Sequence, residues 1–120
     1  MRIPARLVAA VAALALLLVA PAAAEASWGA IAIDPTNGKI GYARHLGTVA
    51  AAKETALKNC AESHCKVAVW VSNGYGAVVQ KKSGLYIAGL GRTKNLAFRD
   101  ARERAREQAP AVAWVFSGLS

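Results

Sequence analysis

The sequence is short of the side chains on which most enzymes rely. Among its 120 residues there are only two cysteines, two histidines and seven acidic residues. The histidines, His45 and His64, fall in separate segments without an evident serine or acidic partner, and paired carboxylates for acid–base chemistry are scarce. We therefore predict no catalytic residues and no cofactor. An enzyme that depends on His45, His64 or Cys65 is the least favoured alternative.

The chain also lacks an apolar run long enough to cross a membrane. Its longest run extends from Leu7 to Ala20, whereas a spanning helix needs about 20 apolar residues, and no basic stop-transfer segment follows. Two arginines precede the run and small residues follow it, which is the order found in a secretory signal peptide. We predict a signal peptide over residues 1–26, cleaved after Ala24 or Ala26, and a secreted or periplasmic protein without a membrane span after cleavage.

Acidic residues are outnumbered by basic ones in the rest of the chain. Cleavage removes Arg2 and Arg6 from the 15 basic residues and leaves 13, against six or seven acidic residues, so the mature net charge is +6 or +7. Residues 27–120 are long enough to bury one hydrophobic core but not two. We predict one basic, secreted α+β domain over this range.

The two cysteines lie close together in "CAESHC", from Cys60 to Cys65. In an exported protein such a pair normally forms a disulfide, which contributes about 2 kcal/mol in the chain-entropy model. Zinc would need four ligands, and besides Cys60, His64 and Cys65 only His45 is available. We favour the disulfide and predict no metal site. A reactive Cys65 thiol, with its pKa lowered by His64, stays an alternative.

The mature sequence contains an internal duplication, with units at residues 28–72 and 74–117. Each unit reads as a strand, a turn, a second strand, a helix and a third strand that contains a tryptophan. Trp70 and Trp114 are counterparts. This pattern predicts an α+β fold of two β-β-α-β pseudo-repeats sharing one core, with about six strands and two helices. The strand order stays open, as does the choice between one sheet and two half-sheets.

Turn residues divide each unit into strands. The segment "DPTNG" separates Trp28–Ile33 from Lys39–Ala43, and "KKSG" separates Tyr75–Gln80 from Leu85–Leu90, so each pair is predicted to form a hairpin. The Asn-Gly dipeptide between the units is also typical of a hairpin turn. It predicts that the last strand of the first unit pairs with the first strand of the second.

Two helices are predicted to begin after Thr48 and Thr93, which are suitable N-cap residues. Pro110 is predicted to end the second helical region. The predicted buried faces follow spacings of three and four and consist mainly of small residues. They are Val49, Ala52, Ala56, Leu57 and Cys60 in the first helix, and Ala97, Ala101 and Ala105, with Phe98 beside them, in the second.

The second predicted helix carries most of the basic candidates for binding. Its arginines suit an anionic envelope polymer or nucleic acid, but interleaved acidic residues favour a self-paired, solvated face. The segments "RHLGT" and "GLGRT" before the two helices are candidates for an anion site at a helix N-terminus, although a plain connection is favoured. The candidate anion- or partner-binding residues are Arg44, His45, Arg92, Thr93, Lys94, Arg99, Arg102 and Arg106.

The tryptophans are the main aromatic candidates for a binding surface. Trp70 and Trp114 occupy repeat-related positions, so we predict that both belong to the core. Trp28, close to the mature N-terminus, is the candidate for an exposed aromatic surface.

Several segments together resemble a domain-of-unknown-function family, number 4189. They are "WGAIAI", "CKVAVWV", "NGYGAVV" and "VAWV", and the resemblance covers residues 28–117. It implies a small secreted bacterial α+β protein with disulfides, and it brings no established catalytic residues. Family members often carry cysteines where this chain has Ala105, Ala109 and Tyr75, so the resemblance leaves Cys60–Cys65 as the single expected bridge.

From the sequence we expect an exported, non-enzymatic domain that binds a protein partner in the envelope or outside the cell. An electrostatic binder of anionic envelope polymer or nucleic acid is the second hypothesis, and its binding would weaken steeply with salt. An envelope hydrolase or redox enzyme is the third. The sequence is compatible with a homodimer and identifies no particular partner.

Overall fold

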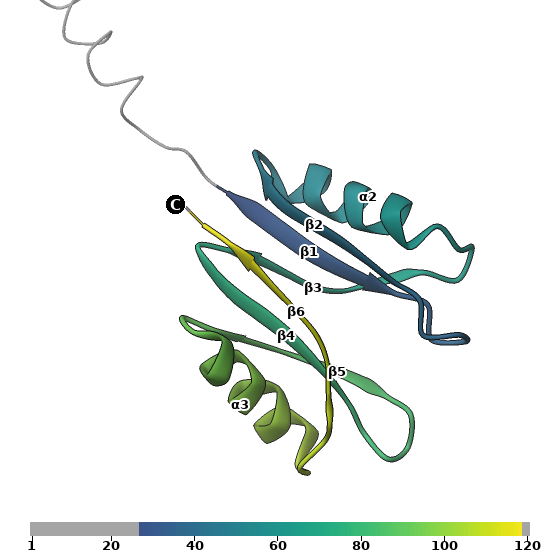
Figure 1. Ribbon diagram of the computed structural model, residues 1–120, viewed down its shortest axis with the longest axis vertical. Coiled ribbons are helices and arrows are strands. Elements are labelled where there is room, and N and C mark those ends of the chain that lie inside the picture. Colours follow the sequence, from purple (N-terminus) through teal and green to yellow (C-terminus); the bar gives the residue numbers. More distant parts are fainter. Residues whose placement is uncertain (1–26, 119–120) are drawn as a thin grey trace, which may run out of the picture.

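The computed structural model describes residues 27–118, which form six strands and two helices (Figure 1). The strands are β1 (Trp28–Ile33), β2 (Ile40–Leu46), β3 (Lys66–Ser72), β4 (Gly74–Gln80), β5 (Tyr86–Gly91) and β6 (Ala111–Ser117), and the helices are α2 (Val49–Cys60) and α3 (Lys94–Ala105). The predicted signal peptide and its cleavage sites lie outside the described residues. Within residues 27–118, no helix has the length and apolar character needed to cross a membrane.

The two repeats form two separate three-stranded sheets. Their strand orders are β2-β1-β3 and β5-β4-β6, and all neighbouring strands are antiparallel. The first strand of each repeat is therefore the central strand of its sheet. Figure 1 shows the sheets stacked face to face, with α2 outside one and α3 outside the other. The predicted α+β fold of two β-β-α-β repeats is confirmed, in the form of two half-sheets.

The predicted pairing of β3 with β4 is wrong. β3 pairs with β1, whereas β4 pairs with β5 on one side and β6 on the other. Because strands of its own repeat occupy both sides of β4, no edge is left for β3. Asn73, which joins the two strands, has a positive φ of 56°, and the chain passes there from one sheet to the other. The two hairpins predicted within the repeats, β1–β2 and β4–β5, are confirmed.

Aliphatic side chains, mainly branched ones, fill the space between the two sheets. The first repeat contributes Ile31, Ile33, Val69 and Val71, and the second contributes Val78, Ala113 and Val115. A sheet has to bury its apolar face against another element. The two repeats meet this requirement by covering each other, so they share one core as predicted.

Small side chains bring each helix close to its sheet. The buried helix residues are Ala52, Ala56 and Cys60 in α2 and Ala97, Ala101 and Ala105 in α3. A Cβ atom at Gly41 of β2 would overlap the Ala56 carbonyl oxygen, which shows how closely α2 lies. Leu57, predicted on the buried face, is 37% exposed because it lies one residue around the helix from the Ala52–Ala56–Cys60 stripe.

Both predicted N-caps are confirmed. Thr48 Oγ1 accepts the Ala51 N–H at 3.1 Å, and Thr93 Oγ1 accepts the Leu96 N–H at 3.2 Å. Both helices end at a residue in the left-handed conformation, Ala61 with φ 62° and Arg106 with φ 60°.

The prediction that Pro110 ends the second helix is wrong. α3 ends at Ala105, where the left-handed backbone of Arg106 breaks the helical path, and Pro110 comes immediately before β6.

A disulfide joins Cys60, the last residue of α2, to Cys65, which directly precedes β3. This confirms the favoured interpretation over a zinc site or a reactive thiol. The bridge fits an oxidising compartment such as the periplasm or the extracellular space. Among residues 27–118, no three His, Cys, Asp or Glu side chains are grouped so that they could hold a metal ion.

Candidate functional site

A shallow furrow runs between two edge strands, β3 of one sheet and β5 of the other. Three hollows of about 480, 240 and 360 Å³ follow one another along it. The first two share Trp70 and Leu90, and the last two share Ala68. We call this channel, lined mainly by residues 66–74 and 84–92, the β3–β5 furrow.

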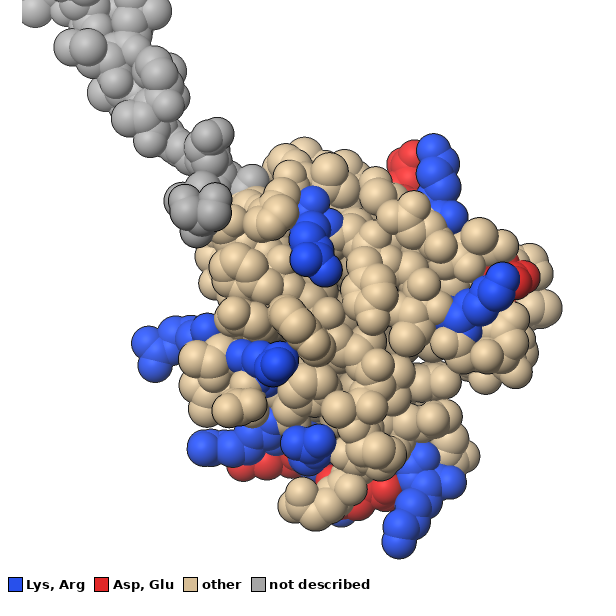
Figure 2. Space-filling view, viewed as in Figure 1, with Lys and Arg blue, Asp and Glu red and all other residues tan. Residues whose placement is uncertain are grey.

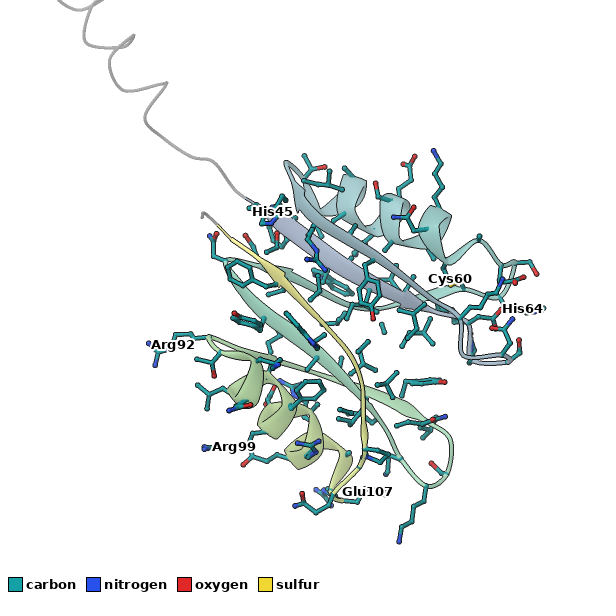
Figure 3. The ribbon with its side chains drawn as sticks, in the orientation of Figure 1. His45, Cys60, His64, Arg92, Arg99 and Glu107 are labelled. Atoms are coloured by element: carbon teal, nitrogen blue, oxygen red, sulfur yellow. A yellow bond between two sulfur atoms is a disulfide. The ribbon has the colours of Figure 1, made fainter. Side chains whose placement is uncertain are left out.

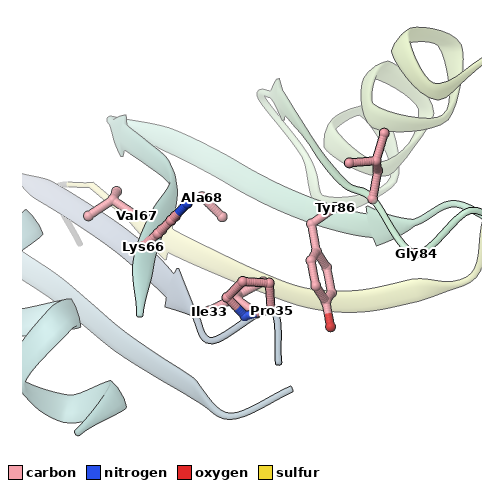
Figure 4. A pocket seen from close by; sticks show the side chains of 8 residues that line it. Ile33, Pro35, Lys66, Val67, Ala68, Gly84 and Tyr86 are labelled. Atoms are coloured by element: carbon pink, nitrogen blue, oxygen red, sulfur yellow. The ribbon is translucent and has the colours of Figure 1, made fainter. Parts of the chain in front are cut away.

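Apolar side chains dominate the surface of the β3–β5 furrow. Trp70, Leu85 and Leu90 are 45%, 61% and 48% exposed. Figure 4 shows the hollow nearest the start of both strands, with Ala68 on one side and Tyr86 on the other. A soluble domain rarely leaves large apolar side chains together at its surface unless they contact something. The furrow is therefore the candidate interaction site.

The charged groups that line the furrow are basic. Each of the three hollows is lined by one basic residue, Arg92, Arg104 or Lys66, and, within the described range 27–118, by no acidic residue. Arg104 Nε pairs at 3.0 Å with Oδ2 of Asp100, four residues earlier on α3, which agrees with the self-pairing expected on this helix. Lys66 and Arg92 therefore leave positive charge at the two ends of the furrow.

The two strands that border the furrow differ in their outer edges. On β5, the Leu90 N–H donates to Asp100 Oδ2 at 2.9 Å, so a side chain of α3 occupies part of that edge. On β3, one side pairs with β1, and no other hydrogen bond reaches the backbone of Lys66–Ser72 from the described part of the chain. An edge strand with unpaired N–H and C=O groups is a template for another strand.

The core prediction for two of the tryptophans is wrong. Trp70 and Trp114 are 45% and 41% exposed. Trp28, the predicted surface candidate, is half-buried against α2 and its sheet and lines the 480 Å³ hollow of the furrow. α2 covers β1 and β2, and α3 covers β4 and β5, so the edge strands β3 and β6 are left largely uncovered. A tryptophan on the helix side of either edge strand therefore faces solvent.

Each exposed tryptophan lies beneath a lysine of the helix in its own repeat. Lys53 Nζ is 3.8 Å from the centre of the Trp70 ring, and Lys94 Nζ is 5.0 Å from that of Trp114. Both distances allow a cation–π interaction. The two tryptophans thus share a lysine over the ring and similar exposure, although Trp114 also packs on the Tyr75 ring at 5.9 Å. Of the two, only Trp70 lines the furrow hollows.

The basic candidates from the sequence are spread over several places. Arg92 lines the furrow, while the hydroxyl of Thr93 is used as a helix cap. Arg44 and His45 lie on β2, in the other repeat. Figure 3 shows Arg92 and Arg99 projecting from the α3 side of the molecule, away from His45.

The remaining arginines line a separate hollow of about 500 Å³ on α3. Arg102 is partly structural there, because its Nε donates to the Ala109 carbonyl oxygen at 2.9 Å. Carboxylates share the hollow, and Figure 2 shows red among blue along the edge where α3 lies. Anion binding by these residues stays a prediction. The charged residues lining this hollow are Arg99, Arg102, Glu103, Arg106 and Glu107.

The structure brings together one polar cluster that sequence reasoning missed. Ser27 Oγ lies 3.3 Å from His45 Nδ1 and 2.9 Å from Ser117 Oγ, and the His45 N–H donates to Ser117 Oγ at 3.1 Å. The three residues are distant in sequence, and only the positive φ of His45 hints at an unusual local role. Ser117 is fully buried and Ser27 is 8% exposed, so the hydroxyls tie the start of β1, the end of β2 and the end of β6 together rather than face a substrate.

Comparisons with known proteins identify a family and a similar solved structure. Residues 28–114 match the family model described as "Domain of unknown function (DUF4189)". Among solved structures, the chain is similar to the NMR structure of Rv1813c from Mycobacterium tuberculosis, with 36% sequence identity, a TM-score of 0.58, and coverage of 74% of this chain and 73% of that one. No curated protein matches significantly.

Proposed function

Because the chain belongs to the family of the domain of unknown function DUF4189, which carries no stated activity, we propose a function from its surface. The protein is an exported, non-enzymatic domain that binds a protein partner in the envelope or outside the cell. The partner docks in the β3–β5 furrow.

The exposed apolar lining of this furrow is the observation that carries the proposal. Trp70 and Leu90 are each nearly half exposed and line the two hollows toward the end of β3. Tryptophan and arginine are the residues most enriched at the energetic centres of protein interfaces. Here Trp70, Arg92 and Arg104 line neighbouring hollows, which is the composition of a protein-binding surface.

Two further observations support export. The segment before residue 27 has the order of a signal peptide, and Cys60 and Cys65 are joined in a disulfide that fits an oxidising compartment. A partner would therefore be met in the periplasm, at the cell surface or in the medium.

The test is affinity capture with residues 27–120 from envelope and culture-medium fractions, read by mass spectrometry. We expect a partner retained by the wild type at low and moderate salt, and retained at least about tenfold less by Trp70→Ala. Trp114→Ala is the matched control, because Trp114 has nearly the same exposure and a lysine over its ring but lies outside the furrow hollows. Equal retention by Trp70→Ala and the wild type would contradict the furrow as the docking site.

The same experiment separates the electrostatic alternative. If α3 bound an anionic polymer, retention would fall steeply between low and moderate salt because binding would be driven by counterion release. It would also fall in Arg99→Gln with Arg106→Gln, two exposed arginines outside the furrow, and would be unchanged in Trp70→Ala.

A further inference from the structure

Resting on the proposed function, we infer that the segment of the partner that docks is an extended, acidic peptide, and that it adds to the open edge of β3 as a fourth strand. The sheet would then have the order β2-β1-β3-peptide. This assigns both the backbone conformation and the charge of the ligand.

The free edge of β3 argues for strand addition. β3 is seven residues long, so its edge extends for about 23 Å at roughly 3.3 Å per residue. The other border of the furrow, β5, is less suitable because Asp100 already accepts the Leu90 N–H. A strand paired with β3 directs every second side chain to the same side, where a row of hollows follows the strand.

The lining of the hollows argues for acidic residues in the peptide. Lys66 at the start of β3 and Arg92 beside its end are both exposed. Arg104, in the hollow between them, is paired with Asp100, so Lys66 and Arg92 carry the argument. Among residues 27–118, no carboxylate lines any of the three hollows. A ligand with carboxylates on alternate residues would place opposite charge along the furrow while its apolar residues contact Trp70, Leu85 and Leu90.

The same charges argue against a second copy of this chain as the occupant. Residues 27–118 carry 13 basic and six acidic residues, and a second copy pairing through β3 would bring its own Lys66 to an edge that is already basic. Like charges placed together at an interface disfavour that partner.

The experiment is a selection of displayed random ten-residue peptides on the disulfide-bonded domain, residues 27–120. We expect the enriched peptides to alternate apolar and acidic residues, and their synthetic versions to bind Trp70→Ala at least about tenfold more weakly than the wild type. The double variant Lys66→Glu with Arg92→Glu should lose at least as much peptide affinity as Trp70→Ala. Trp114→Ala and Arg99→Glu with Arg106→Glu are the controls for aromatic removal and for charge reversal outside the furrow, and they should bind like the wild type.

Backbone pairing is tested by N-methylating alternate residues of the best peptide, in both registers. This removes amide donors and leaves the side chains and charge unchanged. One register should lose at least about tenfold in affinity and the other should lose little, because a strand pairs through alternate residues. Hydrogen exchange of the wild-type complex should show new protection of amides within Lys66–Ser72. This measurement locates the binding site without the need for a protein variant.

The outcomes separate this inference from the proposed function. Peptides that depend on Trp70 but tolerate N-methylation in both registers, or that lack acidic residues, would overturn the acidic strand and leave the furrow as the docking site. The inference would also be overturned if the selection enriched no peptide above the background measured on Trp70→Ala. A concentration-dependent dimer in sedimentation that Lys66→Glu strengthens or Trp70→Ala dissociates would assign the edge to a second copy. Both proposals fail if neither captured proteins nor peptides depend on Trp70.

Discussion

At the scale of single residues, similar sequence contexts have different outcomes because neighbouring elements decide exposure. Trp70 and Trp114 look like core residues in an alternating apolar strand, yet both are exposed because the helices do not cover the edge strands. Trp28, on the central strand β1, is half-buried instead. A residue's place in its sheet, which depends on strand order, therefore determines whether its side chain is exposed.

Gly41 is required by the close approach of α2. A Cβ there would overlap the backbone of Ala56 and Cys60, so we expect Gly41→Ala to lower the free energy of unfolding by about 2 kcal/mol through overpacking. Urea unfolding measures the effect. Gly47→Ala is the control, because a Cβ at Gly47 would meet nothing within 4 Å; a loss of equal size in both variants would contradict the explanation.

Asp34 is expected to titrate abnormally. The Thr36 hydroxyl, which donates to Asp34 Oδ1, lowers the pKa of this carboxyl below its ordinary value of 3.8, with burial acting in the opposite direction and the Thr36 N–H and His64 adding to the lowering. A lowered pKa in the folded state means that the associated stability is present above pH 3.8 and is lost as the pH falls through the folded pKa.

We predict that Thr36→Val raises the pKa of Asp34 toward 3.8, because it removes the first of these causes. Carbon-13 NMR of the Asp34 carboxyl during an acid titration measures it. Thr36→Ser, which keeps the hydroxyl, should leave the pKa low. An Asp34 pKa that is the same in Thr36→Val and the wild type would show that the hydroxyl bond is not the cause.

At the scale of elements, the two repeats close the connection from helix to last strand in different ways. In the first, the Cys60–Cys65 disulfide joins the end of α2 to the start of β3. In the second, Ala105 takes the place of Cys60, and the bond from Arg102 Nε to the Ala109 oxygen holds the connection before β6. The covalent tie therefore belongs to the connection that leads into β3, the strand that borders the furrow.

Removing the Cys60–Cys65 disulfide should lower the stability of the protein and increase local opening mainly in the first repeat. We expect Cys60→Ala with Cys65→Ala to lower the free energy of unfolding by about 2 kcal/mol, the chain-entropy value for such a short loop. Hydrogen exchange should show the largest increase in amide exchange rate in the segment between α2 and β3. The α3–β6 connection is the internal control, and an equal gain there would mean that the bridge acts only on global stability.

At the scale of the whole molecule, the stacking of the sheets makes one folding unit from two repeats. Ile31 of the first repeat and Val78 and Val115 of the second are fully buried in the same cluster. In the part of the chain that the structure describes, neither sheet has another element to cover this face, so separated repeats would expose it. The furrow exists only because the edges of both sheets lie side by side.

This arrangement predicts cooperative unfolding. Ile31→Val should lower the free energy of unfolding by about 1 kcal/mol, and native-state hydrogen exchange should show the same loss for the slowest amides of both sheets. Leu57→Ala, at an exposed position on α2, should change the exchange protection of both sheets much less. A loss confined to residues 28–72 in Ile31→Val would mean that the repeats unfold independently.

The sequence by itself determined the features that depend on neighbours along the chain. The duplication, the β1–β2 and β4–β5 hairpins, the Thr48 and Thr93 caps and the Cys60–Cys65 bridge all agree with the structure. Turn conformation, helix capping and the closing of a short disulfide loop involve residues only a few positions apart, so residue type and spacing are enough to predict them.

Only the tertiary structure decided which strands are edges and what they expose. The Asn-Gly segment suggested a hairpin, but pairing of β4 with both β5 and β6 sent β3 to the edge of the other sheet. The edge position of β3 exposed Trp70 and created the β3–β5 furrow. The stacking of the sheets placed Ser27, just before β1, beside Ser117, at the end of β6. These features join residues far apart in sequence, and the competition among strands for partners and the stacking of two sheets, which decide them, leave no local pattern in the chain.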